Sequence, residues 1–256
     1  MYKIPANTLF LGKNLVFMPE CHSTNTFALE LCQQSSSSAE GTVVITANQS
    51  AGRGQRGNVW IVEPGKNLTF SVILRPSFLP VKDQFYLNIF SALAICDYLK
   101  EAGCEDVRIK WPNDIYVRDK KICGILIESQ LQGSKITSSV LGIGLNINQR
   151  NFTMGTATSL TLETGRDCDL QQALEQLLGF LEARYLQLRQ KLQSLKIDYL
   201  DNLYWINEEH TFQSLELGVF NGTICGLDPA GQLLIRIDGK EKAFGIKDVA
   251  YVHAMQ

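Results

Sequence analysis

Apolar and polar residues alternate along this chain with two different periods, and these periods predict where its helices and strands lie. Residues 26–34 and 170–192 keep apolar side chains three and four positions apart, which is the spacing of one helical face. Residues 83–102 are apolar around the whole helical circumference, which predicts a buried helix that ends at Gly103. A second short helix is expected around residues 197–205.

Strands are predicted where β-branched and aromatic residues run together or alternate with polar ones. The predicted strands of the first part of the chain are residues 8–11, 41–47, 67–74, 107–110, 115–117, 121–129 and 138–148. Three turn signals then separate about five short strands between Thr211 and Val252. The pattern therefore predicts an α/β body at residues 1–208 and a small β-barrel at residues 209–256.

Composition excludes several classes of function. The 256 residues suffice for one large domain with a small module, and the net charge of −2 supplies no overall field for nucleic acid. The seven Cys residues are scattered without a Cys-x-x-Cys pair, which indicates reduced thiols in a cytoplasmic protein and no metal cluster. No apolar run reaches membrane-spanning length and the chain does not begin with a signal peptide, so we expect no membrane contact.

The stretch from residue 49 to residue 60 has the composition of an anion-binding loop. Glycines let backbone amides approach a ligand closely, and arginines offer forked donors for carboxylate or phosphate oxygens. No acidic residue occurs between Glu40 and Glu63. The residues concerned are Gly52, Arg53, Gly54, Arg56 and Gly57. Since glycine and arginine are also common in surface loops, both readings stay open at this point.

Two further groups of polar residues each allow a structural and a functional reading. Ser23, Thr24 and Asn25 precede the helix at residues 26–34 and suit its N-cap, but their side chains also suit a polar ligand. Lys121 follows the turn of a predicted hairpin and is either a solvated lysine or a fixed cation. Neither group alone decides between a structural role and a role in ligand binding.

Four segments, taken together and in order, resemble the biotin protein ligases. Each carries a motif of that family, and the spacing between them agrees. The resemblance is close from about residue 17 to residue 150 and looser beyond. The segments are Ser23–Asn25, Gly52–Trp60, Lys110–Asp114 followed by Lys121–Glu128, and Gly142–Asn146.

This resemblance implies a fold and a reaction. The fold would be a class II synthetase-like catalytic domain with a mixed sheet and flanking helices, followed by an SH3-like β-barrel. The reaction would join biotin and ATP, with Mg²⁺, into biotinyl-5′-AMP. The biotinyl group would then pass to one lysine of a biotin carboxyl carrier protein, from acetyl-CoA carboxylase or another biotin-dependent carboxylase.

The resemblance also implies roles for individual residues. Lys121 and Arg53 would be catalytic. The expected biotin-binding residues are Ser23, Thr24, Asn25, Gln49, Gly52, Arg53, Gly54, Gln55 and Lys121. The expected ATP-binding residues are Arg56, Trp60, Asn113 and Asn146, and Asp114 would hold Mg²⁺. A core position for Trp60 is the alternative.

The chain departs from the family pattern at two places. Gln55 stands where the family loop often has a second arginine, so retention of the adenylate is expected to be looser unless Arg56 compensates. The catalytic motifs begin by Ser23, which leaves no room before them for the DNA-binding domain of some members, so we expect no repressor role and no DNA binding. Family members often dimerise through edge strands, and the strand at 138–148 is one candidate edge.

Three rival functions remain from the sequence. A lipoate–protein ligase would share the fold and the adenylation chemistry. A biotin sensor, or another anion-binding module without turnover, would share the loop but would not need Arg53 and Lys121.

Overall fold

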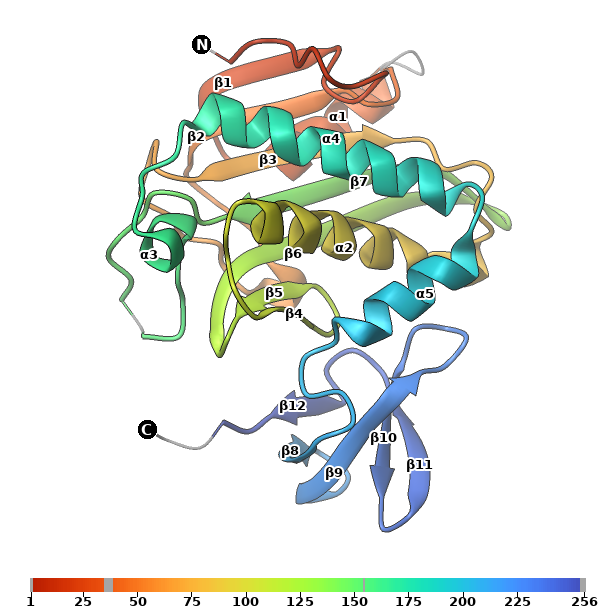
Figure 1. The fold of residues 1–256 in the computed structure, drawn as a ribbon. Helices are drawn as coiled ribbons and strands as arrows, with labels where there is room; N and C mark the ends of the chain where they lie inside the picture. The colour runs from red at the N-terminus through yellow and green to blue at the C-terminus, as the bar shows by residue number, and fades with distance from the viewer. Residues whose placement is uncertain (1, 35–38, 154, 254–256) are drawn as a thin grey trace.

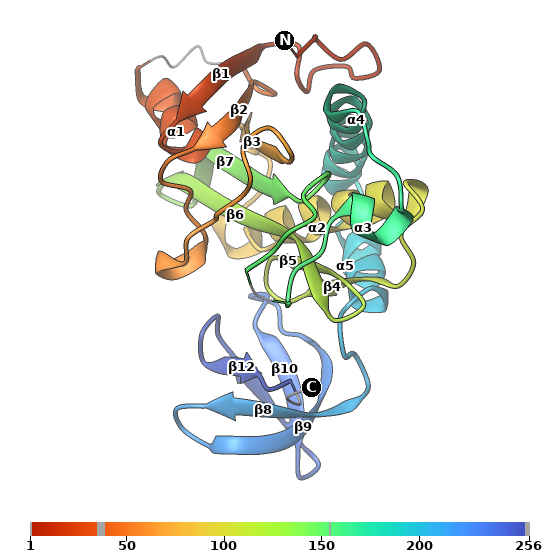
Figure 2. The same cartoon turned by 90° about the vertical axis from the view of Figure 1, so that its left-hand side faces the viewer.

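The computed structural model describes residues 2–34, 39–153 and 155–253, which form two β-sheets and their covering helices (Figures 1 and 2). The larger sheet has the order β1-β2-β3-β7-β6-β5-β4. The pair β1–β2 is parallel and the other neighbours are antiparallel, which confirms the predicted mixed sheet. The strands are β1 (Leu15–Cys21), β2 (Val43–Gln49), β3 (Leu68–Leu74), β4 (Val107–Lys110), β5 (Asp114–Val117), β6 (Lys120–Gln132) and β7 (Lys135–Leu145).

Helices cover both faces of this sheet. Figure 1 shows α2 (Tyr86–Glu101) and α4 (Leu170–Leu188) lying across one face, with α5 (Leu192–Asp201) leading toward the second sheet. On the other face, α1 (Thr24–Gln34) packs Ala28 into a small apolar cluster with residues of β2, β3 and β7. The short elements are α3 (Leu160–Thr164), η1 (Gln55–Gly57) and η2 (Val81–Asp83). Within the described ranges, no helix is long and apolar enough to cross a membrane.

The second sheet contains the five strands expected from the turn signals. They are β8 (Glu209–Ser214), β9 (Gly218–Leu227), β10 (Leu233–Ile237), β11 (Lys240–Phe244) and β12 (Val249–Tyr251), in the order β11-β10-β9-β8-β12. All of these pairings are antiparallel. They do not include the β11–β12 pairing that would close a barrel. The sheet is tied to the larger one by the indole of Trp111, whose Nε1 donates to the carbonyl of Gly231 at 2.9 Å.

Residues 8–11 do not form the predicted strand, because a buried side chain binds their backbone. The amides of Leu9, Phe10 and Leu11 donate to the carboxylate of Glu182 at 2.6, 2.8 and 2.9 Å. Glu182 belongs to α4 and is 5% exposed. A carboxylate that accepts three amide protons satisfies groups that a sheet would otherwise pair.

Two helices form where two were predicted, at residues 170–192 and around 197–205, but the break between them lies earlier than the pattern indicated. α4 ends at Leu188, and α5 begins at Leu192 and ends at Asp201, short of the predicted residue 205. Leu188 and Leu195 are both buried, so the apolar spacing continues across a break in the backbone. Apolar periodicity alone cannot reveal such a break, since no proline or glycine lies between the two helices.

The strand at 138–148 is not an edge, which corrects the expectation that it offers a dimer surface. β7 pairs with β3 on one side and with β6 on the other along most of its length. Its backbone groups are therefore used within the sheet and cannot pair with a second chain.

We predict that Glu182→Ala lowers the free energy of unfolding by about 3 kcal/mol or more, because three partly or fully buried amides lose a charged acceptor. Denaturant unfolding followed by circular dichroism measures the change. The matched control is Glu101→Gln at the exposed end of α2, which should change stability by less than about 0.5 kcal/mol. Equal small effects of both substitutions would contradict the structural role of Glu182.

Candidate active site

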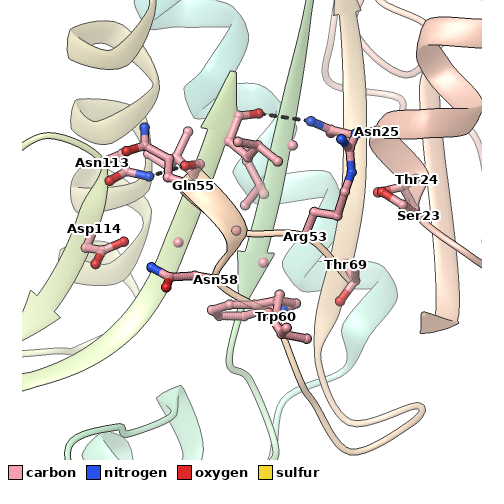
Figure 3. A pocket seen from close by; sticks show the side chains of 18 of the residues that line it. Ser23, Thr24, Asn25, Arg53, Gln55, Asn58, Trp60, Thr69, Asn113 and Asp114 are labelled. Carbon is pink, nitrogen blue, oxygen red and sulfur yellow. Dashed lines mark hydrogen bonds between the residues drawn. The ribbon is translucent and has the colours of Figure 1, made fainter. Parts of the chain in front are cut away.

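A cavity of about 440 Å³ opens on the face of the larger sheet that carries α1. Its floor is formed by β6 and β7, and its walls come from the N-terminus of α1, the loop between β2 and β3, and the turn between β4 and β5. Residues 246–247, in the turn between β11 and β12 of the second sheet, complete the lining. Figure 3 shows two ends: Asn113 and Asp114 lie at one, and Ser23, Thr24 and Asn25 lie at the other.

The floor is flat because three glycines replace side chains on paired strands. Gly124 of β6 pairs with Gly144 of β7, and Gly142 points to the same face two residues away. A Cβ at Gly144 would lie 2.2 Å from Cε2 of Trp60, and one at Gly142 would lie 2.2 Å from Oδ1 of Asn25. The glycines therefore let the Trp60 ring and the Asn25 amide lie directly on the strands.

A chain of hydrogen bonds orders the α1 end of the cavity. Oε1 of Gln49 accepts from the backbone amide of Thr24 at 2.8 Å. Oγ of Ser71, which is fully buried, lies 2.7 Å from Oγ1 of Thr24 and 2.6 Å from Oδ1 of Asn25. Oδ1 can only accept, so the single Ser71 proton goes to Asn25. The single Thr24 hydroxyl proton then goes either to Ser71 or to Oε1 of Gln49, which lies 3.2 Å from Oγ1 of Thr24. This network holds the side chains of three elements in one arrangement.

Ser23 has both of the roles that the sequence left open. Its Oγ accepts from the amide of Thr26 at 3.5 Å, a long cap of α1, and the residue also lines the cavity. Ser23, Thr24 and Asn25 are each 5% exposed or less, so their polar groups face the cavity or the protein rather than bulk water.

Lys121 lies at the other end, paired with Asp114. Its Nζ is 2.7 Å from Oδ1 of Asp114 and 5.7 Å from the centroid of the Trp60 ring. Its backbone is held on both sides by residues 156–158, through Lys121 N to Thr156 O and Thr158 N to Lys121 O, each 2.9 Å. The lysine is thus fixed at its backbone, while its ammonium can exchange partners.

Arg53 is also paired with a carboxylate in this structure. Its Nη2 lies 2.9 Å from Oε2 and 3.2 Å from Oε1 of Glu128 on β6. Nδ2 of Asn25 donates to the same Oε2 at 2.9 Å. The Arg53 and Glu128 side chains are 46% and 28% exposed, so the attraction between them is screened by water and weak.

Lys110 lies beside the site but contributes less charge to it. Its Nζ lies 3.1 Å from the hydroxyl of Tyr116 and 3.2 Å from Nε2 of His253, under the second sheet. Burial lowers the pKa of Lys110 to about 8, with Asp114 opposing the shift and Lys121 adding to it. Lys121, and not Lys110, lines the cavity at this end.

The structure gathers most of the predicted site residues around one cavity. Its lining includes Ser23, Thr24, Asn25, Gln49, Arg53, Gly54, Gln55, Trp60, Asn113, Asp114 and Lys121. Gly52 packs behind the loop, where a Cβ would lie 2.3 Å from the carbonyl oxygen of Trp60. Asn146 is buried and donates to the carbonyl of Thr158 at 3.0 Å, outside the cavity lining. The side chain of Arg56 lies outside what the structure describes. The ligand contacts of all these residues stay predictions.

Several lining residues were not predicted. Thr69 and the supporting Ser71 are polar positions in an otherwise apolar strand, and that interruption was the available signal. Gly124 lies inside the Lys121–Glu128 motif, in which only Lys121 was given a role. Lys247 lies in the turn between β11 and β12 with a backbone φ of +82°, and nothing in its sequence neighbourhood indicated a place at this cavity.

Asp114 is the carboxylate of the lining. No group of three or more His, Cys, Asp or Glu side chains that could hold a metal ion occurs in the part of the chain the structure describes. A cation here would therefore need oxygen ligands from a bound molecule as well as from Asp114, which is how Mg²⁺ commonly binds.

We predict that Gly144→Ala displaces the Trp60 ring from the floor, because the new Cβ would lie 2.2 Å from that ring. Tryptophan fluorescence should shift to longer wavelength as the indole meets water. The control is Gly179→Ala on α4, where the Cβ meets nothing within 4 Å and a gain of about 0.5–1 kcal/mol in stability is expected. An unshifted spectrum in Gly144→Ala would contradict the packing described here.

Comparison with known proteins identifies the family of this chain. The model of the biotin/lipoate A/B protein ligase family matches residues 18–146. A bifunctional ligase/repressor of Bacillus spizizenii is 31% identical over 248 residues, which are 94% of this chain and 74% of that protein. A biotin–[acetyl-CoA-carboxylase] ligase of Mycobacterium tuberculosis is 28% identical over 217 residues, covering 83% of this chain and 80% of that protein.

A solved structure extends the likeness to the whole fold. The biotin protein ligase from Aquifex aeolicus in complex with biotin and ATP aligns with a TM-score of 0.77 and 27% identity, over 94% of this chain and 100% of that chain. The family match covers half of the sequence, including the glycine-arginine loop, Lys121 and the glycine floor. The chain therefore belongs to the biotin/lipoate A/B protein ligase family.

Proposed function

We propose that this protein is a biotin protein ligase that makes biotinyl-5′-AMP from biotin and ATP and transfers the biotinyl group to a lysine of a carrier protein. The observation that carries the proposal is a cavity with a glycine floor whose lining includes the cations Arg53, Lys121 and Lys247. Arg53 and Lys121 are each held by an exchangeable carboxylate, so substrate anions can replace those partners.

The first step joins two anions that repel each other. An oxygen of the biotin carboxylate attacks the α-phosphorus of ATP, and the bond from that phosphorus to the bridging oxygen of pyrophosphate breaks. Positive groups fixed at the point of attack lower the energy of the transition state without reorganising during the reaction. Lys121 fits this role because its backbone is pinned at residues 156–158 and its Nζ lies at the cavity.

The α1 end of the cavity suits the ureido ring of biotin. That ring offers two N–H donors and one carbonyl acceptor, which need hydroxyl and amide partners of fixed orientation. Ser23, Thr24, Asn25 and Gln49 supply such groups. Hydrogen bonds from Ser71 hold Thr24 and Asn25 in place, and the Thr24 amide holds Gln49. The carboxylate tail of the substrate would then lie toward Arg53 and Lys121.

The opposite end suits the nucleotide. Trp60 provides a flat aromatic surface for adenine, and Asn113 and Asp114 lie at the end expected for the phosphates. Asp114 fits a Mg²⁺ ion bound jointly by one carboxylate and the phosphates, and such an ion would neutralise phosphate charge. Asp114 would then release Lys121 to the reacting atoms.

The relatives support biotin as the substrate. The Mycobacterium tuberculosis relative, which covers 83% of this chain, is named a biotin–[acetyl-CoA-carboxylase] ligase, and the Aquifex aeolicus protein is described with biotin and ATP together. The natural acceptor is accordingly proposed to be a biotin carboxyl carrier protein of acetyl-CoA carboxylase. A homodimer remains a prediction without an assigned surface, since β7 does not supply the edge.

Incubation with ATP, Mg²⁺ and a carrier domain, with either biotin or lipoate, tests this function. Mass measurement of the acceptor should reveal biotinylation in the first case and little modification in the second. Preferred lipoylation would identify the rival ligase, and an unmodified acceptor with both acids would favour a binding protein without turnover.

We predict that Lys121→Ala slows adenylate formation by at least about a hundredfold, because removal of a fixed group that stabilises transition-state charge has effects of this size. Quantifying biotinyl-5′-AMP measures the rate. Lys120→Ala removes the exposed lysine next to it in the same hairpin and should leave the rate near normal. Near-normal turnover of Lys121→Ala would remove this residue from the mechanism.

We predict that Gln55→Arg slows release of biotinyl-5′-AMP, because a cation at the cavity lining adds attraction to the phosphate. Release is measured by trapping free adenylate after dilution. Gln55→Glu is the opposite-charge control and should speed release. If the arginine variant releases the adenylate as fast as wild type, the residue at position 55 does not control how long the protein retains the adenylate.

A further inference from the structure

A second cavity of about 410 Å³ opens next to the first, between the glycine-arginine loop and β6. Loop residues 51–54 and 57–59 line it, together with Leu126 and Glu128 of β6. The glycines, Val59 and Leu126 give it a largely apolar wall. Glu128 is the acidic residue among the side chains of this lining.

The two cavities share part of their walls. Arg53, Gly54, Asn58, Val59 and Leu126 line both of them. Glu128 lines the second cavity and not the first, and Arg53 lies between the two with its Nη2 on the Glu128 carboxylate. A side chain that enters the second cavity therefore comes to the boundary of the first.

The Arg53–Glu128 ion pair in this wall can separate with little loss of free energy. Both partners of the Arg53–Glu128 pair are partly exposed, and exposed pairs contribute little to stability. An anionic adenylate in the first cavity attracts Arg53 and leaves Glu128 with Asn25 as its remaining partner, through Nδ2 at 2.9 Å. The negative charge of Glu128 would then face the second cavity without a cation.

We propose that the second cavity is the entry site of the acceptor lysine, and that Glu128 binds its ammonium group once Arg53 has turned to the adenylate. This inference rests on the proposed ligase function. A lysine side chain has an apolar four-carbon stem and a charged head, and the site matches it with an apolar wall and one carboxylate. Glu128 acts as a positioning residue that holds the nitrogen beside the first cavity.

The transfer moves the biotinyl group from AMP to the lysine nitrogen. The ammonium releases one proton to solvent, and the neutral nitrogen attacks the acyl carbon of biotinyl-5′-AMP. The carbon–nitrogen bond forms, the bond from that carbon to the phosphate oxygen breaks, and AMP leaves with the electron pair. A second proton passes to solvent as the amide forms.

The test compares a charged and an uncharged nucleophile with synthetic biotinyl-5′-AMP supplied to every variant. The carrier lysine is an ammonium at neutral pH, whereas hydroxylamine is neutral. Glu128→Gln keeps the size of the side chain and loses its charge, so the rate ratio of lysine to hydroxylamine transfer should fall about tenfold or more, mostly through KM for the carrier. Glu128→Asp should recover part of the ratio.

Two further variants sharpen this test. Glu20→Gln removes an exposed carboxylate of β1 and should leave the ratio at its wild-type value. Ala51 lines the second cavity alone, so Ala51→Phe should fill it and lower the ratio by obstruction, with folding checked by circular dichroism.

The outcomes separate this inference from the proposed function. If wild type makes no adenylate from biotin and ATP, the proposed function is wrong. If wild type makes and transfers the adenylate but the ratio is unchanged in Glu128→Gln, or both rates fall equally, the acceptor site at Glu128 is wrong.

Discussion

The site depends on the absence of three side chains from two paired strands. Gly124, Gly142 and Gly144 leave the middle of the sheet bare on the α1 face, and Trp60 and Asn25 lie directly on it. A single methyl group at 142 or 144 would occupy space that belongs to these two residues. The position of the aromatic surface and that of the amide network therefore follow from the same glycines, on a rigid sheet rather than on loops.

The cations around this floor are paired with carboxylates that a substrate anion can replace. Lys121 is held by Asp114 and Arg53 by Glu128, and each pair is partly open to water. An internal carboxylate keeps each cation oriented before substrate binds, at little energetic cost when a substrate anion replaces it. By contrast, the buried Glu182, which organises the N-terminal turn, is committed to three amides and has no such freedom.

Apolar periodicity predicted the longer helices, and the family resemblance implied the mixed sheet and about half of the residues that line the cavity, because periodicity and the glycine-arginine and Lys121 motifs are local properties. These expectations failed where a distant side chain decided the outcome. Residues 8–11 have strand composition, but Glu182, more than 170 positions away, binds their amides. The edge prediction for residues 138–148 failed because strand order depends on pairing across the whole sheet. Ser71 and Lys247 reach the site only through the fold.

In the proposed function, one cavity brings the biotin carboxylate and the α-phosphate of ATP together. Pyrophosphate release by the purified protein, with biotin and Mg-ATP supplied separately and together, measures whether this happens. We expect release only when both substrates are present, with biotinyl-5′-AMP formed in equal amount. Release with ATP alone, or no release with both substrates, would show that the cavity does not join them.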